Sequence, residues 1–396
     1  MSGRPDGGGA RPEEQPRRLV LAGGGTGGHL YPALSIAHAL RQSPGPCTPV
    51  FIGTHAGLEA RVVPEQGFEF HAVRSRKISR SLSPGAALSA AAIAWGAAQA
   101  ALLLRRLAPV AVIGTGGYAS AGVLLAAVLQ RIPTLIHEQN SLPGRTNRFL
   151  ARWVRMVALT FPESAAAFPA GKTLVTGLPV RPEIALGDRR RGYERFGLSP
   201  EQPTLLVLGG SLGARSLNRA VGAALPLWSN SGLQILHQVG RGNWEEHRAA
   251  LGEAPPWYHP VPYMEAMGDA YAVADLVCCR AGGSTLAEIS LVGRPALLVP
   301  YPHAHADHQT RNARSVAGAG AAVLLPDAEL SGQRLASDVN ALIAQPALRA
   351  EMARASRSLG RPGAADAILD AVWDMVGQRG ARAAQPAEHG TKRGAA

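Results

Sequence analysis

Gly23-Gly24-Gly25-Thr26-Gly27-Gly28-His29 directly follows the first apolar run of the chain, residues 18–22. Three more glycine-rich turns have the same placement, at residues 114–118, 209–214 and 281–285. A glycine turn that leads into a helix presents backbone N–H groups at the positive end of the helix dipole, where phosphate binds. Because two such turns lie in each half of the 396-residue chain, the sequence predicts two nucleotide-type domains that face each other, with phosphates of two substrates between them.

Apolar runs alternate with stretches of helical periodicity in both halves. The predicted strands are residues 18–22, 49–52, 110–113, 134–136, 205–208, 233–237, 276–278 and 296–299, and the predicted helices are 31–40, 120–129, 216–225, 285–292 and 364–376. This alternation is typical of a parallel, doubly wound sheet. The predicted fold class is therefore α/β, with two Rossmann-like doubly wound parallel-sheet domains joined at the proline-rich residues 177–182.

The first turn also satisfies G-x-G-x-x-G, the pattern of dinucleotide-binding dehydrogenases. That pattern needs an acidic residue at the end of the second strand to hold the ribose hydroxyls, and residues 51–55 contain none. Four phosphate-type turns are also more than one dinucleotide requires. The sequence therefore argues against a dehydrogenase.

The formal net charge of +12 is unevenly distributed. Residues 70–137 contain no Asp or Glu but hold seven Arg and Lys residues. A basic surface can face acidic substrates, anionic lipid or nucleic acid, and an Arg-rich composition can also produce one. The chain lacks an RNP-like motif and a helix-turn-helix pattern, so we expect no nucleic-acid partner.

No metal or other cofactor is predicted. The three cysteines lack C-x-x-C spacing, which indicates a reduced, cytosolic protein, and the cluster His303, His305, Asp307 and His308 fits no standard metal site. The chain also contains no Asp-x-Asp. A sugar-transfer enzyme of this sequence would have to stabilise its leaving diphosphate with backbone N–H groups and Arg.

Residues 86–104 carry no charge and approach the length of a membrane span. Just over half of them are alanine, so we expect a buried or interfacial helix rather than a transmembrane one. The two ends, residues 1–17 and 378–396, are polar, and we expect disordered tails without a secretory signal.

Several segments together resemble the MurG family of N-acetylglucosaminyltransferases, which convert lipid I to lipid II in peptidoglycan synthesis. They are residues 24–33, 116–118, 137–140, 179–181, 209–214, 279–288 and 300–312, and the resemblance spans about residues 18–377. The chain departs from the family pattern at Leu178, where Asn is common, in the loop 302–308, and at Gly283-Ser284, where other members carry bulkier residues.

The resemblance implies the GT-B architecture, with a deep cleft between the two domains. Residues 18–182 would form the acceptor and membrane-docking domain, and residues 183–362 the UDP-GlcNAc-binding domain. Residues 363–377 would form a helix that crosses back to the N-terminal domain.

The resemblance also implies the site. The residues expected at UDP-GlcNAc are Thr26, Gly27, Gly28, Asn140, Arg181, Ser211, Met264, Gly283, Ser284, Thr285, Leu286, Ala287, Glu288 and Gln309. Gly116, Gly117 and Tyr118, together with the first turn, would face the diphosphate of lipid I. Glu288 would accept hydrogen bonds from the ribose hydroxyls, and Ser211 would meet the donor diphosphate.

In the family's reaction, the C4 hydroxyl of the acceptor attacks the anomeric carbon and inverts it from α to β. The base that this step requires is expected to be His29, because imidazole titrates near neutrality and the helix dipole behind it should lower its pKa. A structural or acceptor-positioning role for His29 stays open, with Glu138 as the second candidate base.

Lipid I is embedded in the membrane, so a membrane-docking patch is expected on the cytoplasmic face of the bacterial inner membrane. Its predicted residues are Arg74, Arg76, Lys77, Ile78, Arg80, Leu82 and Trp95, which combine apolar insertion with attraction to anionic inner-leaflet lipid. A core helix with a solvated basic rim is the alternative. The expected partners are UDP-GlcNAc, lipid I and other cell-wall synthesis or division proteins.

Three other functions stay open at this level. One is a related transferase that glycosylates another lipid or a secondary metabolite. The second is a GT-B-fold UDP-sugar epimerase, which needs no lipid acceptor, and the third is a sensor that binds UDP-sugar without turnover.

Overall fold

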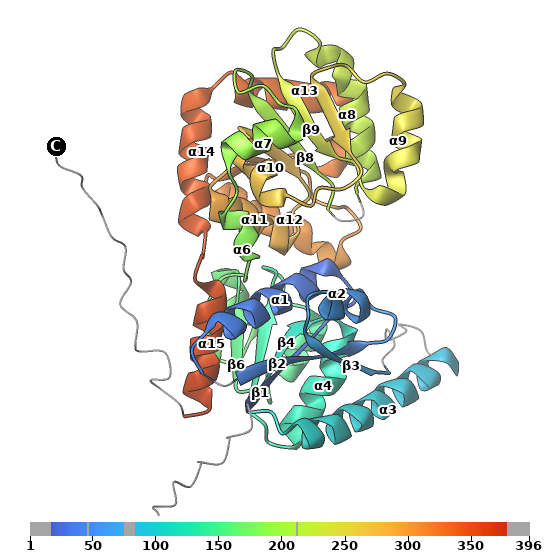
Figure 1. Ribbon diagram of the computed structural model, residues 1–396, viewed down its shortest axis with the longest axis vertical. Coiled ribbons are helices and arrows are strands. Elements are labelled where there is room, and N and C mark those ends of the chain that lie inside the picture. The colour runs from blue at the N-terminus through green and yellow to red at the C-terminus, as the bar shows by residue number, and fades with distance from the viewer. Residues whose placement is uncertain (1–16, 46, 75–83, 211–212, 378–396) are drawn as a thin grey trace, which may run out of the picture.

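The computed structural model describes residues 17–45, 47–74, 84–210 and 213–377, and these residues form two α/β domains, one above the other in Figure 1. The first sheet consists of β1 (Arg17–Gly23), β2 (Cys47–Thr54), β3 (Glu69–Val73), β4 (Ala111–Gly116), β5 (Thr134–Glu138), β6 (Met156–Leu159) and β7 (Thr173–Val175). The second consists of β8 (Thr204–Leu208), β9 (Gln234–Gln238), β10 (Tyr258–Val261), β11 (Leu276–Cys279), β12 (Ala296–Leu298) and β13 (Ala322–Leu324).

Helices cover both faces of each sheet. In the first domain they are α1 (Gly27–Gln42), α2 (Glu59–Glu65), α3 (Pro84–Leu107), α4 (Tyr118–Leu129) and α5 (Arg145–Leu150). The following helices are α6 (Pro182–Ala185), α7 (Arg189–Phe196), α8 (Arg215–Trp228), α9 (Trp244–Leu251), α10 (Met267–Val273), α11 (Gly283–Val292), α12 (His308–Gly318), α13 (Gly332–Ile343), α14 (Pro346–Leu359) and α15 (Ala364–Met375).

All described strand pairs are parallel, and the strand order is β3-β2-β1-β4-β5-β6-β7 in one sheet and β10-β9-β8-β11-β12-β13 in the other. The order reverses between β1 and β4 and again between β8 and β11. In open parallel sheets, ligands bind beyond the carboxyl ends of the strands at such a reversal. All four glycine turns follow a strand that borders one of these two points, β1, β4, β8 or β11.

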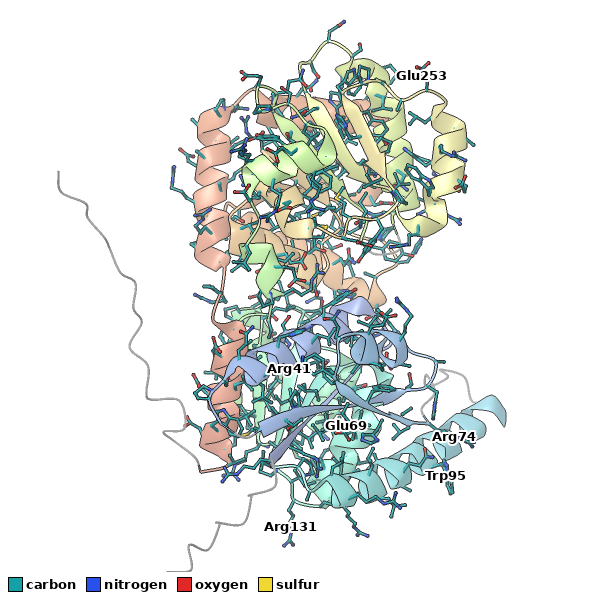
Figure 2. The ribbon with its side chains drawn as sticks, in the orientation of Figure 1. Arg41, Glu69, Arg74, Trp95, Arg131 and Glu253 are labelled. Carbon is teal, nitrogen blue, oxygen red and sulfur yellow. The ribbon has the colours of Figure 1, made fainter. Side chains whose placement is uncertain are left out.

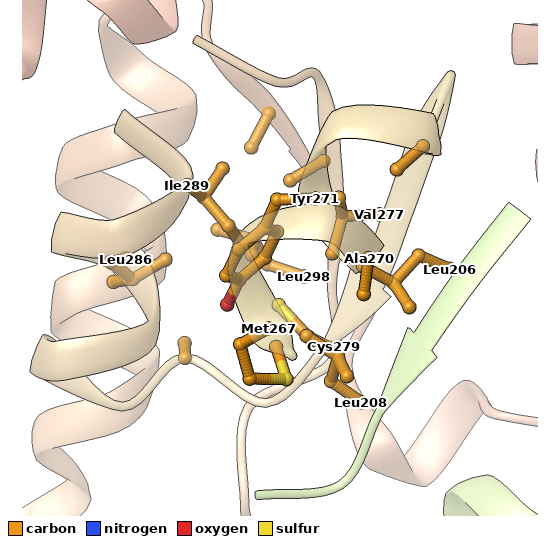
Figure 3. Packing of buried hydrophobic residues seen from close by; sticks show 14 of the residues in the cluster. Leu206, Leu208, Met267, Ala270, Tyr271, Val277, Cys279, Leu286, Ile289 and Leu298 are labelled. Carbon is orange, nitrogen blue, oxygen red and sulfur yellow. The ribbon is translucent and has the colours of Figure 1, made fainter. Parts of the chain in front are cut away.

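The strands are buried because helices lie on both sides of each sheet, which explains their continuous apolar runs. Residues 19–23 of β1 and all of β4 are buried. In the second domain, Tyr271 of α10 is fully buried, and Figure 3 shows its ring among Leu286, Ile289 and Met267.

The last helix belongs to the core of the first domain. Ile368, Leu369 and Val372 of α15 are fully buried and pack in one apolar cluster with Leu30 and Ala33 of α1. Figure 1 shows α14 beside the second domain and α15, further along the chain, beside the first. The chain therefore connects the two domains a second time, near its C-terminal end.

The predicted fold class is confirmed, and each predicted strand and helix corresponds to an observed one. One boundary differs in a way that matters. The first helix begins at Gly27 and not near Tyr31, so the glycine turn supplies the helix's own first turn and His29 lies within it. The uncharged stretch 86–104 lies in α3, and within the described residues no helix has the length and apolar character needed to span a bilayer.

Candidate functional site

His29 lies where the first and second glycine turns meet. Its Nδ1 is 3.0 Å from the backbone oxygen of Thr115, and the hydroxyl of Thr115 donates to the backbone oxygen of His29 at 2.7 Å. A carbonyl oxygen can only accept, so Nδ1 carries the proton of the neutral ring. The lone pair of the imidazole is therefore on Nε2.

The pKa of His29 is lowered from its ordinary value of 6.5, and burial is the main cause. The negative charge of Glu138 and the Thr115 carbonyl act in the opposite direction, while His308 lowers the pKa further. The expected direction is confirmed, but burial is the leading cause of the shift. A ring with a lowered pKa stays neutral near pH 7, as a general base must.

The two glycine turns pack so closely that side chains would not fit between them. Gly116 and Gly117 have φ values of +102° and +83°. A Cβ on Gly116 would lie 2.7 Å from Nδ1 of His29, and one on Gly117 would lie 2.4 Å from the backbone oxygen of Gly24. Glycine is required here both by the backbone conformation and by the close approach.

Glu138 is buried, and both of its carboxylate oxygens are occupied. Oε1 accepts from the backbone and side-chain nitrogens of Asn140 at 3.0 and 3.3 Å. Oε2 accepts from the backbone N–H of Gly144 at 3.1 Å and from Nδ2 of Asn147 at 2.8 Å. A carboxylate offers about four lone-pair sites, and all four are used here. This arrangement fits a residue that shapes the loop 140–147 better than it fits a base.

We expect Glu138→Gln to reduce transfer about tenfold while the acid limb of the pH–rate profile persists and moves to lower pH, because the negative charge that raises the pKa of His29 is lost. The new NH2 group would face backbone and side-chain N–H donors, so the loop would shift but no proton acceptor would be lost. Steady-state kinetics across pH check this, with the exposed Glu163→Gln as the matched control. If the acid limb disappears, Glu138 is the base.

Two residues beside Glu138 support His29. Nε2 of Gln139 donates to the same Thr115 oxygen that accepts from His29, and it also contacts Nδ1 of His137 at 3.2 Å. Nε2 of His137 donates to the backbone oxygen of Gly177 at 3.0 Å, and burial lowers the pKa of His137 to about 4. The His137–Asn140 segment therefore connects the second glycine turn to the joint between the domains.

On the opposite side of the domain junction, Glu288 of α11 accepts from the hydroxyl of Tyr271 at 2.9 Å and lies 3.5 Å from Arg181. Burial raises the pKa of Glu288, although Arg181 opposes this. The pKa of Arg181 is also raised, because the carboxylates of Glu288 and Glu183 outweigh burial. The Arg181 guanidinium lies 5.0 Å from the ring centre of Tyr31 on α1, so it contacts both domains.

The N-terminus of α11 touches the first domain. A Cβ on Gly283 would lie 2.5 Å from the backbone oxygen of Gln139. The Ser284 hydroxyl beside it is buried and has no hydrogen-bond partner within the described part of the chain. Thr285 and Ala287 are half-buried, whereas the Leu286 side chain is in the core, so only its backbone can reach a ligand.

The other predicted donor residues are placed as follows. The Gln309 side-chain oxygen accepts from the backbone N–H groups of Ala281 and Tyr301, at 3.2 and 2.9 Å. Met264 is buried, and its N–H donates to Gln238. Thr26 and Gly28 are exposed, and Gly27 is half-buried. Ser211 and the side chain of Tyr118 lie outside the described residues.

Sequence reasoning missed Glu59. It is fully buried and accepts from the Gly25 N–H at 2.8 Å and from the backbone and hydroxyl of Thr54 at 2.9 and 2.8 Å. A Cβ on Gly24 would lie 2.2 Å from its carboxyl carbon. The end of the second strand, residues 51–55, has no ribose-binding carboxylate, and the carboxylate of Glu59 holds the glycine turn itself.

A cavity of about 590 Å³ lies between α8 and α9, on the outer side of the second domain. None of the predicted site residues lines it. Among the described residues, no group of three or more His, Cys, Asp or Glu side chains is arranged to hold a metal ion. Asn140, Arg181 and Gly283, by contrast, make contacts across the junction of the two domains.

Both halves of the chain match models of one known protein family. The glycosyltransferase family 28 N-terminal domain matches residues 19–159, and the C-terminal domain of the same family matches residues 204–368. The UDP-N-acetylglucosamine–N-acetylmuramyl-(pentapeptide) pyrophosphoryl-undecaprenol N-acetylglucosamine transferase of Desulforudis audaxviator is 42% identical over 91% of this chain and 99% of its own length. The protein of the same name from Moorella thermoacetica is 44% identical over 91% of this chain and 99% of its own length.

A comparison with solved structures also finds a member of this family. The crystal structure of Acinetobacter baumannii MurG has a TM-score of 0.73 and 32% identity, and the match covers 91% of this chain and 100% of that one. A UDP-GlcNAc 2-epimerase from Neisseria meningitidis, bound to UDP-GlcNAc, has a TM-score of 0.63, with 90% of this chain and 100% of that one covered. At 15% identity the epimerase shares the fold alone.

Proposed function

The chain belongs to the UDP-N-acetylglucosamine–N-acetylmuramyl-(pentapeptide) pyrophosphoryl-undecaprenol N-acetylglucosamine transferases of glycosyltransferase family 28, and from this premise we propose how its residues carry out the reaction. It is a hexosyltransferase of peptidoglycan synthesis that moves GlcNAc from UDP-GlcNAc to lipid I. The observation that carries this conclusion is the 42–44% identity over nine-tenths of the chain. The proposed mechanism is supported by the hydrogen bond of His29 to Thr115, which leaves the lone pair of the imidazole on Nε2.

His29 acts as the general base. Its Nε2 takes the proton from the C4 hydroxyl of the muramoyl sugar as that oxygen bonds to the anomeric carbon of GlcNAc. The bond from the anomeric carbon to UDP breaks on the opposite face, its electron pair goes to the diphosphate oxygen, and the configuration inverts from α to β. The imidazolium formed is stabilised by the Thr115 carbonyl at Nδ1 and by the negative charge of Glu138.

The donor is held by the second domain. The N-terminus of α11 and the turn after β8 present backbone N–H groups to the departing diphosphate, and no metal is required. Glu288 accepts hydrogen bonds from the ribose hydroxyls, and the carboxamide of Gln309 reaches the sugar. The support for this assignment is that Glu288, Arg181 and the α11 turn meet at the domain junction.

The transfer itself is tested with UDP-GlcNAc radiolabelled in the sugar, a short-chain lipid I analogue and EDTA. We expect labelled disaccharide product with a β linkage, identified by its proton coupling constant in NMR. Conversion of UDP-GlcNAc to another UDP-sugar without acceptor would favour an epimerase. Binding of UDP-GlcNAc without either product would favour a sensor.

The enzyme docks on the cytoplasmic face of the inner membrane through the first domain. Trp95 of α3 is 59% exposed, and Leu129 at the end of α4 is 76% exposed. Phe149 and Trp153, on and after α5, are also exposed. Figure 2 shows Arg74, Trp95 and Arg131 on the part of the first domain that is far from the second.

The other basic and apolar residues of the predicted patch, Arg76, Lys77, Ile78, Arg80 and Leu82, lie outside the described residues. Exposed aromatic side chains beside Arg residues suit insertion among anionic headgroups. Contacts with other cell-wall synthesis or division proteins stay a prediction.

We expect Trp95→Ala to weaken binding to phosphatidylglycerol vesicles about tenfold, because a tryptophan side chain loses its burial in the acyl region. Co-sedimentation with vesicles measures this, and transfer to a water-soluble acceptor should be unchanged. The matched control is Leu227→Ala, which removes an exposed apolar side chain from the second domain. Equal binding by wild type and Trp95→Ala would remove α3 from the docking surface.

A further inference from the structure

Asn312 on α12 is fully buried at the junction of the two domains. Its Oδ1 accepts from the backbone N–H and the hydroxyl of Ser141, at 2.9 and 3.0 Å. Its Nδ2 donates to Oδ1 of Asn140 at 3.1 Å and to the backbone oxygen of Ala281 at 3.2 Å. Three of these four bonds cross from the second domain to the first.

The amide of Asn312 has no unused hydrogen-bonding capacity. A side-chain amide offers two lone pairs and two N–H donors, and each has a protein partner here. In this arrangement Asn312 therefore does not touch a substrate, and its bonds connect one segment from each domain.

The segments it connects are those that face the two substrates. Asn140 and Ser141 follow β5 and His137–Gln139, which support the base, whereas Ala281 begins the turn that leads into α11. At the same place Gly283 approaches the Gln139 backbone closely enough to exclude a Cβ. The hydrogen bonds of Asn312 therefore hold together the backbones at Gln139 and Gly283, whose close approach requires a glycine at position 283.

We propose that Asn312 is a positioning residue that clasps Asn140-Ser141 to the α11 turn and so keeps the acceptor-side and donor-side halves of the site in register. The kinetic consequence rests on the proposed transfer reaction, whereas the clasp itself does not. In-line attack requires the two reacting atoms at about 3–3.5 Å, and a shift near 1 Å can cost about 100-fold in rate. A hydrogen-bonded clasp between the loops limits such shifts.

The kinetic test compares Asn312→Ala, Ser141→Ala and the double variant. We expect kcat to fall about 30-fold for Asn312→Ala and about threefold for Ser141→Ala, with the dissociation constant of UDP-GlcNAc unchanged by calorimetry. The double variant should be no worse than Asn312→Ala, because both changes break one clasp. Asn340→Ala, an exposed asparagine of α13, is the matched control.

A second readout does not depend on transfer. Small-angle scattering of Asn312→Ala should show a larger radius of gyration than wild type, because the domains separate more freely. If Asn312→Ala folds poorly, Ser141→Ala still tests the proposal, because this variant removes only one half-buried hydroxyl.

Wild-type kcat in both single variants would overturn the clasp. So would a lower melting temperature in Asn312→Ala with unchanged scattering and an inert Ser141→Ala, which indicates a fold-stabilising residue of the second domain. If wild type fails to transfer, the proposed function is wrong, and the scattering comparison then decides the clasp.

Discussion

His29→Ala is expected to lose at least about 100-fold in kcat while binding UDP-GlcNAc as tightly as wild type. The variant removes Nε2, the ring nitrogen of His29 that carries the free lone pair, since Nδ1–H donates to the Thr115 carbonyl. Glu288, Gln309 and the α11 turn, which we propose hold the donor, lie on the second domain and are untouched. Single-turnover transfer and calorimetry with UDP-GlcNAc separate the two effects.

The matched control for this variant is His38→Ala, on the same helix. The His38 ring packs edge-on against Phe68, with 5.0 Å between the ring centres. Near-wild-type transfer by His38→Ala shows that α1 tolerates loss of a histidine. Full activity of His29→Ala would leave His29 a structural role and require a different base.

Glu288→Ala is expected to show the opposite kinetic pattern. The dissociation constant of UDP-GlcNAc should rise at least about 100-fold, since two charge-assisted hydrogen bonds of about 1.5–3 kcal/mol each are lost, whereas kcat at saturation should change little. The variant also leaves the buried Tyr271 hydroxyl and Arg181 without their carboxylate. Calorimetry with UDP-GlcNAc and with UDP measures the loss.

Tyr271→Phe distinguishes nucleotide binding from local packing. It removes the bond to Glu288 and keeps the ring in its apolar cluster. We expect a change in donor affinity of about fivefold or less, because Glu288 keeps both oxygens for the ribose hydroxyls. A Tyr271→Phe variant as weak as Glu288→Ala would mean that Glu288 acts through Tyr271, and the assignment to ribose would fail.

The fold could be predicted because its signals are local. A glycine turn after an apolar run, as at residues 18–29, contains within about a dozen residues the strand, the turn and the start of the helix. The position of His29 followed from the same local pattern. Its lowered pKa also came out in the expected direction, although burial by distant segments is the main cause.

The supports of the site could not be predicted, because their partners are distant in sequence. Glu59 holds Gly25 across 34 positions, and Asn312 holds Ser141 across 171. A carboxylate at residue 59 and an amide at residue 312 look like ordinary polar residues until the sheets bring their partners near. The saturation of Glu138 by Asn140, Gly144 and Asn147 likewise depends on a loop geometry that the motif does not encode.

The most direct test of the mechanism is the pH dependence of kcat/KM for the lipid I analogue. Because the pKa of His29 lies below 6.5, the unprotonated base is present above that pKa and is lost as the pH falls through it. The account predicts that wild type shows one acid limb with its midpoint below pH 6.5 and that the residual activity of His29→Ala lacks this limb. The same acid limb in both proteins would contradict it and assign the titrating base to another residue.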